Sequence, residues 1–546
     1  MRLRGIALFA PALPAILLVG FAACTGDDPD TSGGGNTPGN DGGEAGTNPT
    51  AVTCGPGNTC ANNAACVDGY CCDGACGGTC EACNVAGQEG KCTAVKGPPK
   101  HGKCDGDATG SCAGSCDGTK RDACTYPDVA CGAPPSCAGG TASLAAKCKA
   151  GVCPAATSQV CSLGCLEEGC LGVTQVAAGY YHACAVLTDK RVRCWGENDQ
   201  GQSGQSPIGM PEVKSPDQVS NITGAVMVAA TFSTSCALLG DGTVRCWGNN
   251  VGGQLGIGTT DNTPHPTPAQ VQGVTGATFL SGASAGHFCA IVAGGQIKCW
   301  GGNSSGQLGD GTVGANSPVP TTVCKPDVTP CEPATGATFV AGGDTHTCAI
   351  FAGGKVACWG SNSTGQLGQP VAVTSAPIGM FVPGGFTATY LTAGNQITCA
   401  ASGGEAKCFG GGGGQGRLGN GQDTGVITVP TAVCTKQDCS TKLTGVTAVT
   451  TFDESSCGLA NGGVRCWGSN TGGQLGDGNA SASQNYAATQ SIAAGVVAIS
   501  SGGGAHYAVV VDGANRDVRC WGSEGSYQCG TGVDSKNRPT PVSPKW

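Results

Sequence analysis

From residue 171 onward, short apolar runs alternate with polar turns, and the pattern returns every 50–59 residues. In the first repeat, an apolar run from His182 to Leu187 meets the polar pair Asp189 and Lys190, and a second run ends at Trp195. Two short runs joined by a polar turn predict a β-hairpin. Seven such repeats predict an all-β fold for this part of the chain.

Each repeat is marked by the tripeptide Cys-Trp-Gly, with Cys-Phe-Gly in the fifth. The tripeptide begins at Cys194, Cys246, Cys299, Cys358, Cys408, Cys466 and Cys520. In most repeats Gln-Leu-Gly or a near match follows the tryptophan by seven residues, as at Gln254-Leu255-Gly256. A second cysteine stands in the preceding apolar run of six repeats, at Cys184, Cys236, Cys289, Cys348, Cys399 and Cys457.

The two cysteines of each hairpin are nine or ten residues apart, so the hairpin can place them opposite one another. We therefore predict one disulfide per hairpin, each contributing about 2–3 kcal/mol by closing a short loop. The seventh repeat has Ala508 where the others have the first cysteine, and Cys529 where most have the leucine of Gln-Leu-Gly. We predict that Cys520 pairs with Cys529 instead.

These motifs resemble the repeat of the regulator-of-chromosome-condensation family, with its His-Thr-x-Ala-Leu strand, Val-x-x-Trp-Gly strand and Gly-Gln-Leu-Gly turn. The resemblance covers residues 171–546. It implies a seven-bladed β-propeller with four-stranded blades, in which radial closure leaves only short sheet edges. Residues 171–180 and 536–546 are then expected near each other where the ring closes.

The N-terminal residues 1–24 have the form of a secretory signal, with Arg2 and Arg4 before an apolar stretch. The sequence Phe21-Ala22-Ala23-Cys24 resembles a bacterial lipobox, which implies a lipid anchor on Cys24. Ordinary signal cleavage nearby is the alternative. Residues 25–53 contain almost nothing to bury and predict a flexible linker.

Residues 54–170 hold 20 cysteines and little apolar bulk, which predicts a small module stabilised by disulfides. The run from Cys71 to Cys83 resembles cysteine-rich modules of myxobacterial surface proteins. The pair Cys80-x-x-Cys83 also fits a metal site, but the segment contains His101 as its one histidine. We expect structural disulfides there, with no metal and no cofactor.

The amino-acid composition indicates the cellular compartment and excludes some classes of binding partner. The 39 cysteines favour an exported protein, because the cytosol does not keep disulfides. A formal net charge of −9 offers no basic surface for phosphates, which argues against nucleic acid as a partner. We expect a monomeric lipoprotein of the bacterial outer membrane or cell surface, in contact with the membrane only through its anchor.

Two sets of residues are candidate sites. Histidines 182, 287, 346 and 506 each stand two residues before the cysteine position of a repeat, and we interpret them as structural because a ring separates them. The long third and fifth repeats carry loops with cysteine pairs, Cys324–Cys331 and Cys434–Cys439. We expect both loops on one face, with Lys325, Asp327, Lys436 and Asp438 as candidate binding residues. Insertions without a role are the alternative.

The leading functional hypothesis is a surface-anchored binding protein that uses the propeller as a platform for protein partners. Guanine-nucleotide exchange, the activity of the family's nuclear founder, is the first alternative, and export argues against it. A sialidase is the second, but the spacing from Asp241-Gly242 to Trp247 differs from the Asp-box of sialidases. No set of convergent catalytic residues is seen, so we expect no enzymatic activity.

Overall fold

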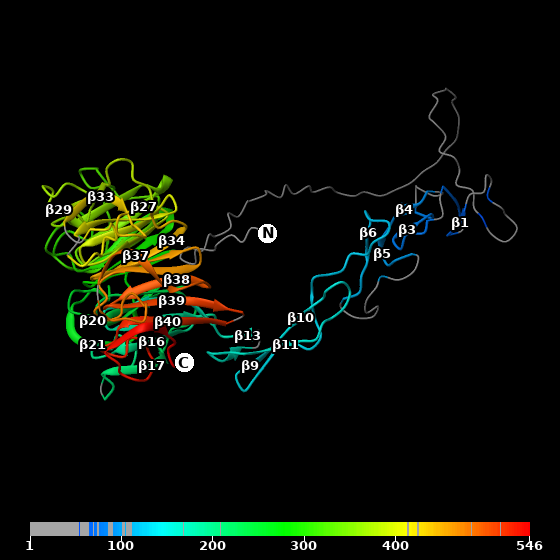
Figure 1. The fold of residues 1–546 in the computed structure, drawn as a ribbon, viewed down its shortest axis with the longest axis horizontal. Helices are drawn as coiled ribbons and strands as arrows, with labels where there is room; N and C mark the ends of the chain where they lie inside the picture. Colours follow the sequence, from blue (N-terminus) through cyan, green and yellow to red (C-terminus); the bar gives the residue numbers. More distant parts are fainter. Residues whose placement is uncertain are drawn as a thin grey trace, which may run out of the picture. The chain divides into compact units, whose positions relative to one another are not determined.

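The computed structural model describes most of the chain beyond residue 53 (Figure 1). The described residues are Cys54, Cys60, 65–68, 70–73, 76–85, 91–100, Cys104, 112–166, 169–207, 209–411, 414–422, 425–481, 483–513 and 515–546. The predicted signal segment, the lipidation candidate Cys24, the linker 25–53 and His101 lie outside them. The described residues divide into two compact units, the second comprising Cys161–Cys165 and Cys170–Trp546.

The first unit is a series of very short strands held together by disulfides. Its strands are β1 (Ala65–Val67), β2 (Tyr70–Cys72), β3 (Glu81–Ala82), β4 (Thr93–Ala94), β5 (Lys96–Gly97), β6 (Cys116–Asp117), β7 (Ala130–Cys131), β8 (Ser136–Ala138), β9 (Thr141–Leu144), β10 (Ala146–Lys147) and β11 (Thr157–Val160), followed by β12 (Cys165–Leu166) and β13 (Gly169–Cys170) between the units. They form two- and three-stranded sheets. Strands this short bury little apolar surface, so they need covalent cross-links.

Disulfides link neighbouring segments along the cysteine-rich region. The pairs are Cys54–Cys66, Cys60–Cys71, Cys72–Cys83, Cys76–Cys92, Cys80–Cys116, Cys104–Cys124, Cys112–Cys148, Cys131–Cys153 and Cys161–Cys170. Cys137 and Cys165 are disulfide-bonded as well. One buried cluster consists of four cysteines with Val67 and Tyr70 packed against them. Sulfur therefore replaces the aliphatic core that the sequence lacks.

The second unit contains seven four-stranded antiparallel sheets among its described residues, each built from four consecutive strands. We call these sheets blades one to seven and their strands A to D in chain order. Blades one and two consist of β14 (Val173–Ala178), β15 (His182–Leu187), β16 (Val192–Glu197), β17 (Glu212–Gln218), β18 (Ala225–Ala230), β19 (Thr234–Leu239), β20 (Val244–Asn250) and β21 (Asp261–Gln270). Blades three and four consist of β22 (Phe279–Ala283), β23 (His287–Val292), β24 (Gln296–Gly301), β25 (Ser317–Thr322), β26 (Ala337–Gly342), β27 (His346–Phe351), β28 (Val356–Ser361) and β29 (Ser375–Phe381).

The remaining blades follow the same order. Blade five consists of β30 (Tyr390–Ala393), β31 (Ile397–Ser402), β32 (Glu405–Gly411) and β33 (Val426–Ala432). Blades six and seven consist of β34 (Val446–Phe452), β35 (Ser455–Ala460), β36 (Gly463–Gly468), β37 (Gln484–Ile492), β38 (Val496–Gly502), β39 (Ala505–Asp512), β40 (Asn515–Ser523) and β41 (Asn537–Val542). Two 3-10 turns, η2 (Ala293–Gly295) and η3 (Ala352–Gly354), join strands B and C in blades three and four.

The A strands form a closed ring. Each contacts the A strand of the next blade, and β38 of blade seven contacts β14 of blade one. Each blade contains consecutive strands only, so no blade combines strands from the two ends of the propeller sequence. The ring therefore closes by packing between blades one and seven. Leu171 and Val173 share a hydrophobic cluster there with Val542 and Trp546, so the two predicted end segments do meet.

Six blades carry a disulfide between strands B and C. The bonded cysteines are direct cross-strand partners with Cα atoms 4.0–4.1 Å apart, and they are buried. The pairs are Cys184–Cys194, Cys236–Cys246, Cys289–Cys299, Cys348–Cys358, Cys399–Cys408 and Cys457–Cys466. Each disulfide joins the middle of its blade, where the strands already pair through their backbones.

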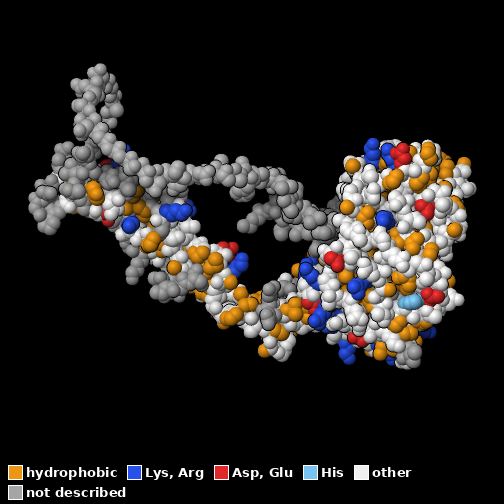
Figure 2. All heavy atoms as spheres, turned by 180° about the vertical axis from the view of Figure 1, so that it is seen from behind, with side chains coloured by type: hydrophobic (Ala, Val, Ile, Leu, Met, Phe, Trp, Pro, Cys, Tyr) orange, Lys and Arg blue, Asp and Glu red, His pale blue; other side chains and the backbone are white. Residues whose placement is uncertain are grey.

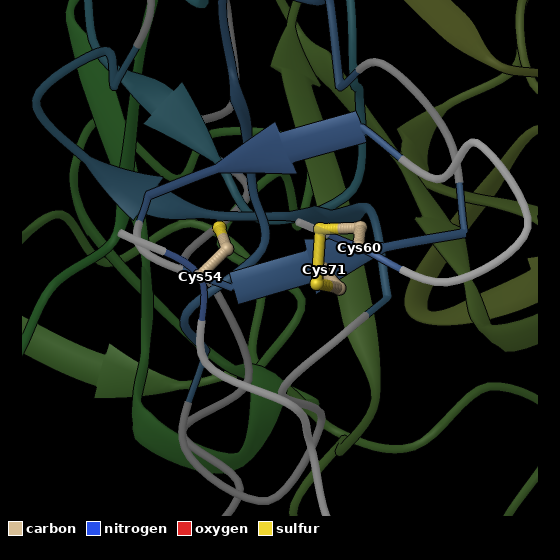
Figure 3. Close-up of side chains that lie close together, drawn as sticks. All are labelled: Cys54, Cys60 and Cys71. Carbon is tan, nitrogen blue, oxygen red and sulfur yellow. A yellow bond between two sulfur atoms is a disulfide. The ribbon is translucent and has the colours of Figure 1, made fainter. Parts of the chain in front are cut away.

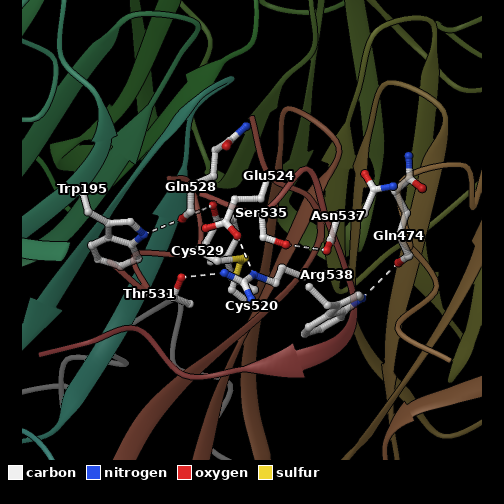
Figure 4. The surroundings of a disulfide bond; sticks show 12 residues. Trp195, Gln474, Cys520, Glu524, Gln528, Cys529, Thr531, Ser535, Asn537 and Arg538 are labelled. Atoms are coloured by element: carbon white, nitrogen blue, oxygen red, sulfur yellow. Dashed lines mark hydrogen bonds and ion pairs between the residues drawn. A yellow bond between two sulfur atoms is a disulfide. The ribbon is translucent and has the colours of Figure 1, made fainter. Parts of the chain in front are cut away.

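Blade seven differs, because Cys520 bonds to Cys529 with a Cα–Cα distance of 5.3 Å (Figure 4). Tyr507, and not Ala508, is the residue opposite Cys520 in strand B. The sequence alignment of this repeat was therefore wrong by one position. The cause is the long hairpin of β39 and β40, in which the register follows from the Asp512–Asn515 pair at the turn.

Hydrogen bonds from tryptophan link six of the seven blades to the preceding blade, and blade five has Phe409 in place of the tryptophan. The indole Nε1–H donates to the backbone carbonyl oxygen at the first position of Gln-Leu-Gly, or its equivalent, in the preceding blade. The pairs are Trp247–Gln202, Trp300–Gln254, Trp359–Gln307, Trp467–Arg417 and Trp521–Gln474, at 2.8–3.0 Å, and Trp195–Gln528 across the closure of the ring. All six indoles are fully buried.

Three histidines add a second hydrogen bond between blades. The Nε2 atom of each lies 2.8 Å from a hydroxyl of the next blade, in the pairs His182–Ser235, His287–Thr347 and His346–Thr398. Each hydroxyl gives its proton to a carbonyl, as Ser235 does to Gln202. The histidine must therefore donate from Nε2, which leaves Nδ1 buried and unpartnered. Burial lowers the pKa of all three rings to about 3.

His506 makes the same contact with the roles exchanged. It lies opposite Trp521 in blade seven, where the other blades have the hydroxyl, and its Nε2 lies 2.8 Å from Ser455 of blade six. Ser455 occupies the position that histidine holds in blades one, three and four. Burial lowers the pKa of His506 to about 3 as well. The four histidines are thus structural partners at four separate junctions.

The tryptophan hydrogen bonds predict unequal effects of Trp→Phe substitutions. In Trp247→Phe the Gln202 carbonyl keeps the Ser235 hydroxyl as a donor, whereas the Gln474 carbonyl has Trp521 as its one donor among the described residues. We expect Trp521→Phe to lower the free energy of unfolding by about 1–3 kcal/mol more than Trp247→Phe, because it leaves a buried acceptor unpaired. Guanidinium titrations followed by tryptophan fluorescence measure the difference; equal losses would contradict the explanation.

The histidines predict acid lability. Their pKa is about 3 in the folded chain against 6.5 for a solvated ring, so the unfolded chain binds extra protons between these values. The contribution of the neutral histidines to the free energy of unfolding is fully present above pH 6.5. It falls as the pH drops toward 3, by about 1.4 kcal/mol per pH unit for each histidine. His346→Asn should make this dependence shallower by one such contribution, measured as unfolding midpoints from pH 7.5 to 4.5. An unchanged slope would exclude His346 as a cause.

Candidate functional site

A narrow cavity of about 160 Å³ runs along the axis of the ring. All seven A strands line it with backbone and small side chains, including the hydroxyl groups of Thr231, Ser281, Thr392, Thr450 and Ser500. Pockets for drug-sized ligands are usually about 300–1,000 Å³, so this cavity is too small for one. A larger partner can contact this cavity only where the cavity reaches the surface.

Aromatic side chains of the A–B turns gather at one end of this cavity. Tyr180 of blade one lies with its ring centroid 4.6 Å from that of Phe232 in blade two and 5.6 Å from that of Phe452 in blade six. Tyr181 stacks edge-on against Tyr180 at 4.5 Å. Phe232 is 45% exposed although it is a large apolar residue. We call these four rings, with Asp344 and Asp453, the channel mouth.

The two carboxylates stand beside the rings. Asp453 accepts hydrogen bonds from the Tyr180 hydroxyl at 3.3 Å and from the Asn395 amide at 3.2 Å. Burial, with Asp453 nearby, raises the pKa of Tyr180 to about 12, so the tyrosine stays neutral and donates. Burial raises the pKa of Asp344, and the charge of Asp453 adds to that effect. The mouth is therefore a place where negative charge is concentrated.

One guanidinium group reaches this region, but its hydrogen bonds go to neutral oxygens. Arg417 replaces the glutamine of Gln-Leu-Gly in blade five and is 7% exposed. It donates to the carbonyls of Gly411 at 2.7 Å and Asp453 at 2.9 Å, and to the Gln396 side chain at 3.4 Å. The seven A–B turns contain Asp344, Asp453 and Glu454 but no lysine, arginine or histidine. Three carboxylates thus face one buried cation.

Further acidic residues border the mouth in blade one. The backbone N–H of Glu197 donates to the carbonyl of Tyr181 at 2.9 Å. Burial, followed by repulsion from Asp199 and Glu212, raises the pKa of Glu197 to about 7. The Gln202 side chain donates to both Glu197 and Asp199 at 3.1 Å. Burial and the neighbouring carboxylates thus favour the protonated form of Glu197 more than in a solvated glutamate.

The structure places the two cysteine-paired loops at the opposite ends of the strands from the channel mouth. Both loops connect strand D to the next strand A, beside the B–C turns, as the Glu405–Thr444 bridge shows. Disulfides close them at Cys324–Cys331 and Cys434–Cys439. The candidate residues Lys325, Asp327, Lys436 and Asp438 are exposed there, and none of them joins the mouth.

These loops also have structural partners. The backbone N–H of Asp327 donates to Gly379 in β29, and that of Ala487 in β37 donates to the carbonyl of Cys434. Each loop thus attaches to the outer strand of the next blade and covers part of its open edge. Lys325 pairs with Glu332 at 3.9 Å, and Asp438 accepts hydrogen bonds from Ser440.

Blade seven has a second unusual feature beside its disulfide (Figure 4). Glu524 stands three residues after the tryptophan, where five blades have an asparagine that fixes the Gln-Leu-Gly turn. It is fully buried and paired with Arg538, which also donates to Thr531 at 2.8 Å. Burial raises the pKa of Glu524. The ion pair and the Cys520–Cys529 disulfide together hold the turn that carries Gln528, the acceptor of Trp195.

Cysteine sulfurs of the first unit lie close enough together to suggest metal sites. One group is Cys54, Cys60 and Cys71, in which Cys60 and Cys71 are bonded to each other and Cys54 to Cys66 (Figure 3). Metals bind thiolates, and a sulfur in a disulfide is not a thiolate. Cys80 and Cys83 bond to separate partners, Cys116 and Cys72. The oxidised module therefore has cross-links at these positions and no ligand set.

Charged residues make up 12% of the chain. On the face shown in Figure 2, lysine, arginine, aspartate and glutamate side chains of the described residues lie singly or in small mixed groups. Within the described residues, no helix is long and apolar enough to cross a membrane. The many disulfides indicate an oxidising environment outside the cytosol.

The channel mouth is not marked by the repeat motifs of the sequence. Tyr180, Phe232, Asp344 and Asp453 occupy one shared position, two residues before strand B, where the other repeats have Ala285, Asn395 and Gly503. The available signal was that this position is aromatic or acidic in four repeats. The repeat motif drew attention to positions shared by the blades, whereas the mouth consists of positions at which the blades differ.

Comparisons with known proteins agree with this architecture. Models of the "Regulator of chromosome condensation (RCC1) repeat" match residues 173–202, 226–254, 241–293, 294–350 and 337–366. A human protein described as "Probable E3 ubiquitin-protein ligase HERC6" is 32% identical over 36% of this chain, and the Arabidopsis thaliana "Ultraviolet-B receptor UVR8" is 29% identical over the same share. The aligned parts make up 19% and 43% of these relatives, so the chain spans less than half the length of either.

Solved structures show the same fold at low sequence identity. Human WBSCR16 superposes with a TM-score of 0.52 at 21% identity, over 60% of this chain and 84% of that one. Prp20p of Saccharomyces cerevisiae gives 0.52 at 18% identity, over 64% and 85%. With the repeat matches and the ring of four-stranded sheets, these likenesses identify the second unit as a β-propeller of the RCC1 repeat type.

Proposed function

We propose that the protein is an exported binding protein, anchored at the cell surface, that uses its RCC1-type propeller as a platform for protein partners. The observation that carries the proposal is the channel mouth, where the exposed ring of Phe232 stands among tyrosines and carboxylates. Aromatic anchors surrounded by polar groups are typical of protein-binding surfaces. The turns are held between paired strands, so little conformational entropy is lost on binding.

Anchoring through Cys24 fits the remainder of the chain. A lipid on this residue would place the molecule on a bacterial outer membrane or cell surface, and the 29 residues from 25 to 53 would span roughly 30 Å as a random coil. The disulfides require an oxidising compartment, which supports export. We propose a monomer that reaches its partner from this tether.

The alternatives have weaker support. Prp20p is described by its binding to Gsp1p and histones, but nucleotide exchange needs a GTPase partner inside the cell, where this chain's disulfides would be reduced. The proposal assigns no catalytic step to the propeller, because the four buried histidines serve separate blade junctions and have pKa values of about 3.

The anchor is tested by metabolic labelling with radioactive palmitate. We expect the wild-type chain to incorporate the label and to fractionate with membranes, and Cys24→Ala to lose both properties, because Cys24 is the proposed attachment point. Cys60→Ala is a matched control that removes a different cysteine. Equal labelling of wild type and Cys24→Ala would contradict lipidation at this residue.

The platform is tested by proximity labelling on intact cells with a peroxidase fused to the C-terminus of the full chain. We expect the same few proteins to be labelled in replicate experiments, and their labelling to fall in a Phe232→Ala variant. A fusion of residues 1–53 to the peroxidase is the control for neighbours of the anchor alone. If the full chain labels only what this control labels, the platform hypothesis is wrong.

A further inference from the structure

Chemistry at the channel mouth narrows the class of partner, provided that the proposed binding function holds. Aromatic faces carry partial negative charge, and carboxylates carry a full one, so both attract a cation. At the mouth the rings of Phe232 and Phe452 lie 4.6 Å and 5.6 Å from that of Tyr180, and Asp453 accepts a hydrogen bond from Tyr180. A cationic ligand is therefore attracted by the aromatic rings and by the carboxylates together.

Arg417 interacts electrostatically with Asp453 and Glu454, and as one cation it offsets only part of the charge of the three carboxylates at the mouth. Asp453 receives hydrogen bonds from two neutral groups, the Tyr180 hydroxyl and the Asn395 amide. Arg417 lies close by, but its guanidinium donates to backbone carbonyls and to Gln396 and forms no ion pair with Asp453. Exposed Glu454 and half-buried Asp344 add two further carboxylates. Glu197 and Asp199 extend the acidic character beside Tyr181.

Shape gives a second reason for an elongated cation. The mouth opens onto a cavity of about 160 Å³ whose wall carries hydroxyls from Ser281, Thr392, Thr450 and Ser500. Such neutral oxygens can accept hydrogen bonds from an ammonium or guanidinium group. A compact inorganic cation has no apolar part that could pack on the exposed ring of Phe232. A basic side chain has an aliphatic stem that packs on the ring while its head reaches oxygen.

We infer that the channel mouth binds lysine or arginine side chains presented by a basic segment of a protein partner. Tyr180 and Phe232 contact the stem and the cationic head, and Asp453 and Asp344 supply the opposite charge. The partner is then a basic protein or a protein with an exposed basic segment. An acidic partner is repelled by the same residues, which gives the surface its specificity.

The test is a titration of the full-length protein with two capped peptides, one of alternating glycine and lysine and one of alternating glycine and glutamate. Isothermal titration calorimetry should detect the lysine peptide and not the glutamate peptide. Added salt should weaken the interaction, because exposed charges are screened. Equal binding of both peptides, or binding of neither, would overturn the inference.

Variants locate the binding site. The double variant Asp344→Asn/Asp453→Asn keeps the shape of both side chains but removes two charges and one of the two acceptor oxygens of Asp453, and it should weaken binding of the lysine peptide about tenfold. Phe232→Ala should weaken it about threefold through loss of the exposed ring. Asp512→Asn is the matched control, since it removes an exposed carboxylate at the B–C end of blade seven, and should leave affinity unchanged. Melting curves of each variant separate loss of binding from loss of folding.

Failure of cation binding at the channel mouth can be distinguished from failure of the platform hypothesis. If the Asp344→Asn/Asp453→Asn variant still labels the same proteins on intact cells while binding the lysine peptide like wild type, the mouth does not recognise cations and another surface carries the function. If surface labelling fails but the lysine peptide binds and the variants weaken it, the chemistry of the mouth stands and the platform hypothesis falls.

Discussion

The hydrogen bond from each buried indole to a carbonyl of the preceding blade is the contact on which the propeller depends. Neighbouring blades must fill the space between them and pair the buried polar groups of their turns. Few aromatic side chains are present to do so, since aromatic residues make up 5% of the chain. The indole meets both demands, because its ring fills the space between blades and its N–H donates to a turn carbonyl, which at Gln254 and Gln474 has no other donor among the described residues. The same geometry recurs at six of the seven junctions and includes the closure by Trp195 and Gln528.

Hydroxyls and histidines complete this network at some junctions and not at others. Where Phe409 replaces the tryptophan, the Thr398 hydroxyl is still the donor to the Gln366 carbonyl. Where Ser455 and His506 have exchanged places, the hydrogen bond between blades six and seven is kept. What is maintained is the pairing of buried donors with buried acceptors, and the residue types change around that requirement. This tolerance explains how repeats of unequal sequence build equivalent junctions.

Disulfides and the hydrogen bonds at blade junctions stabilise different parts of the propeller. The cross-strand disulfides act within blades, and the tryptophan bonds act between them. Blade seven, which closes the ring, has its disulfide moved from strand B to the turn that presents Gln528 to Trp195. The cross-link there stabilises a junction and not a hairpin. With the framework fixed in this way, the A–B turns are free to carry rings and carboxylates that no packing demand requires.

Sequence alone determined the repeat, the strands, the candidate disulfide partners and the Cys520–Cys529 alternative, because each depends on spacing within one hairpin and its turn. It placed Ala508 and His506 wrongly by one position, because strand register in β39 and β40 follows from the turn and not from residue identity. The channel mouth was decided by the tertiary structure alone. Tyr180, Phe232 and Asp453 come from turns up to 273 residues apart, and only closure of the ring brings them within contact of one another.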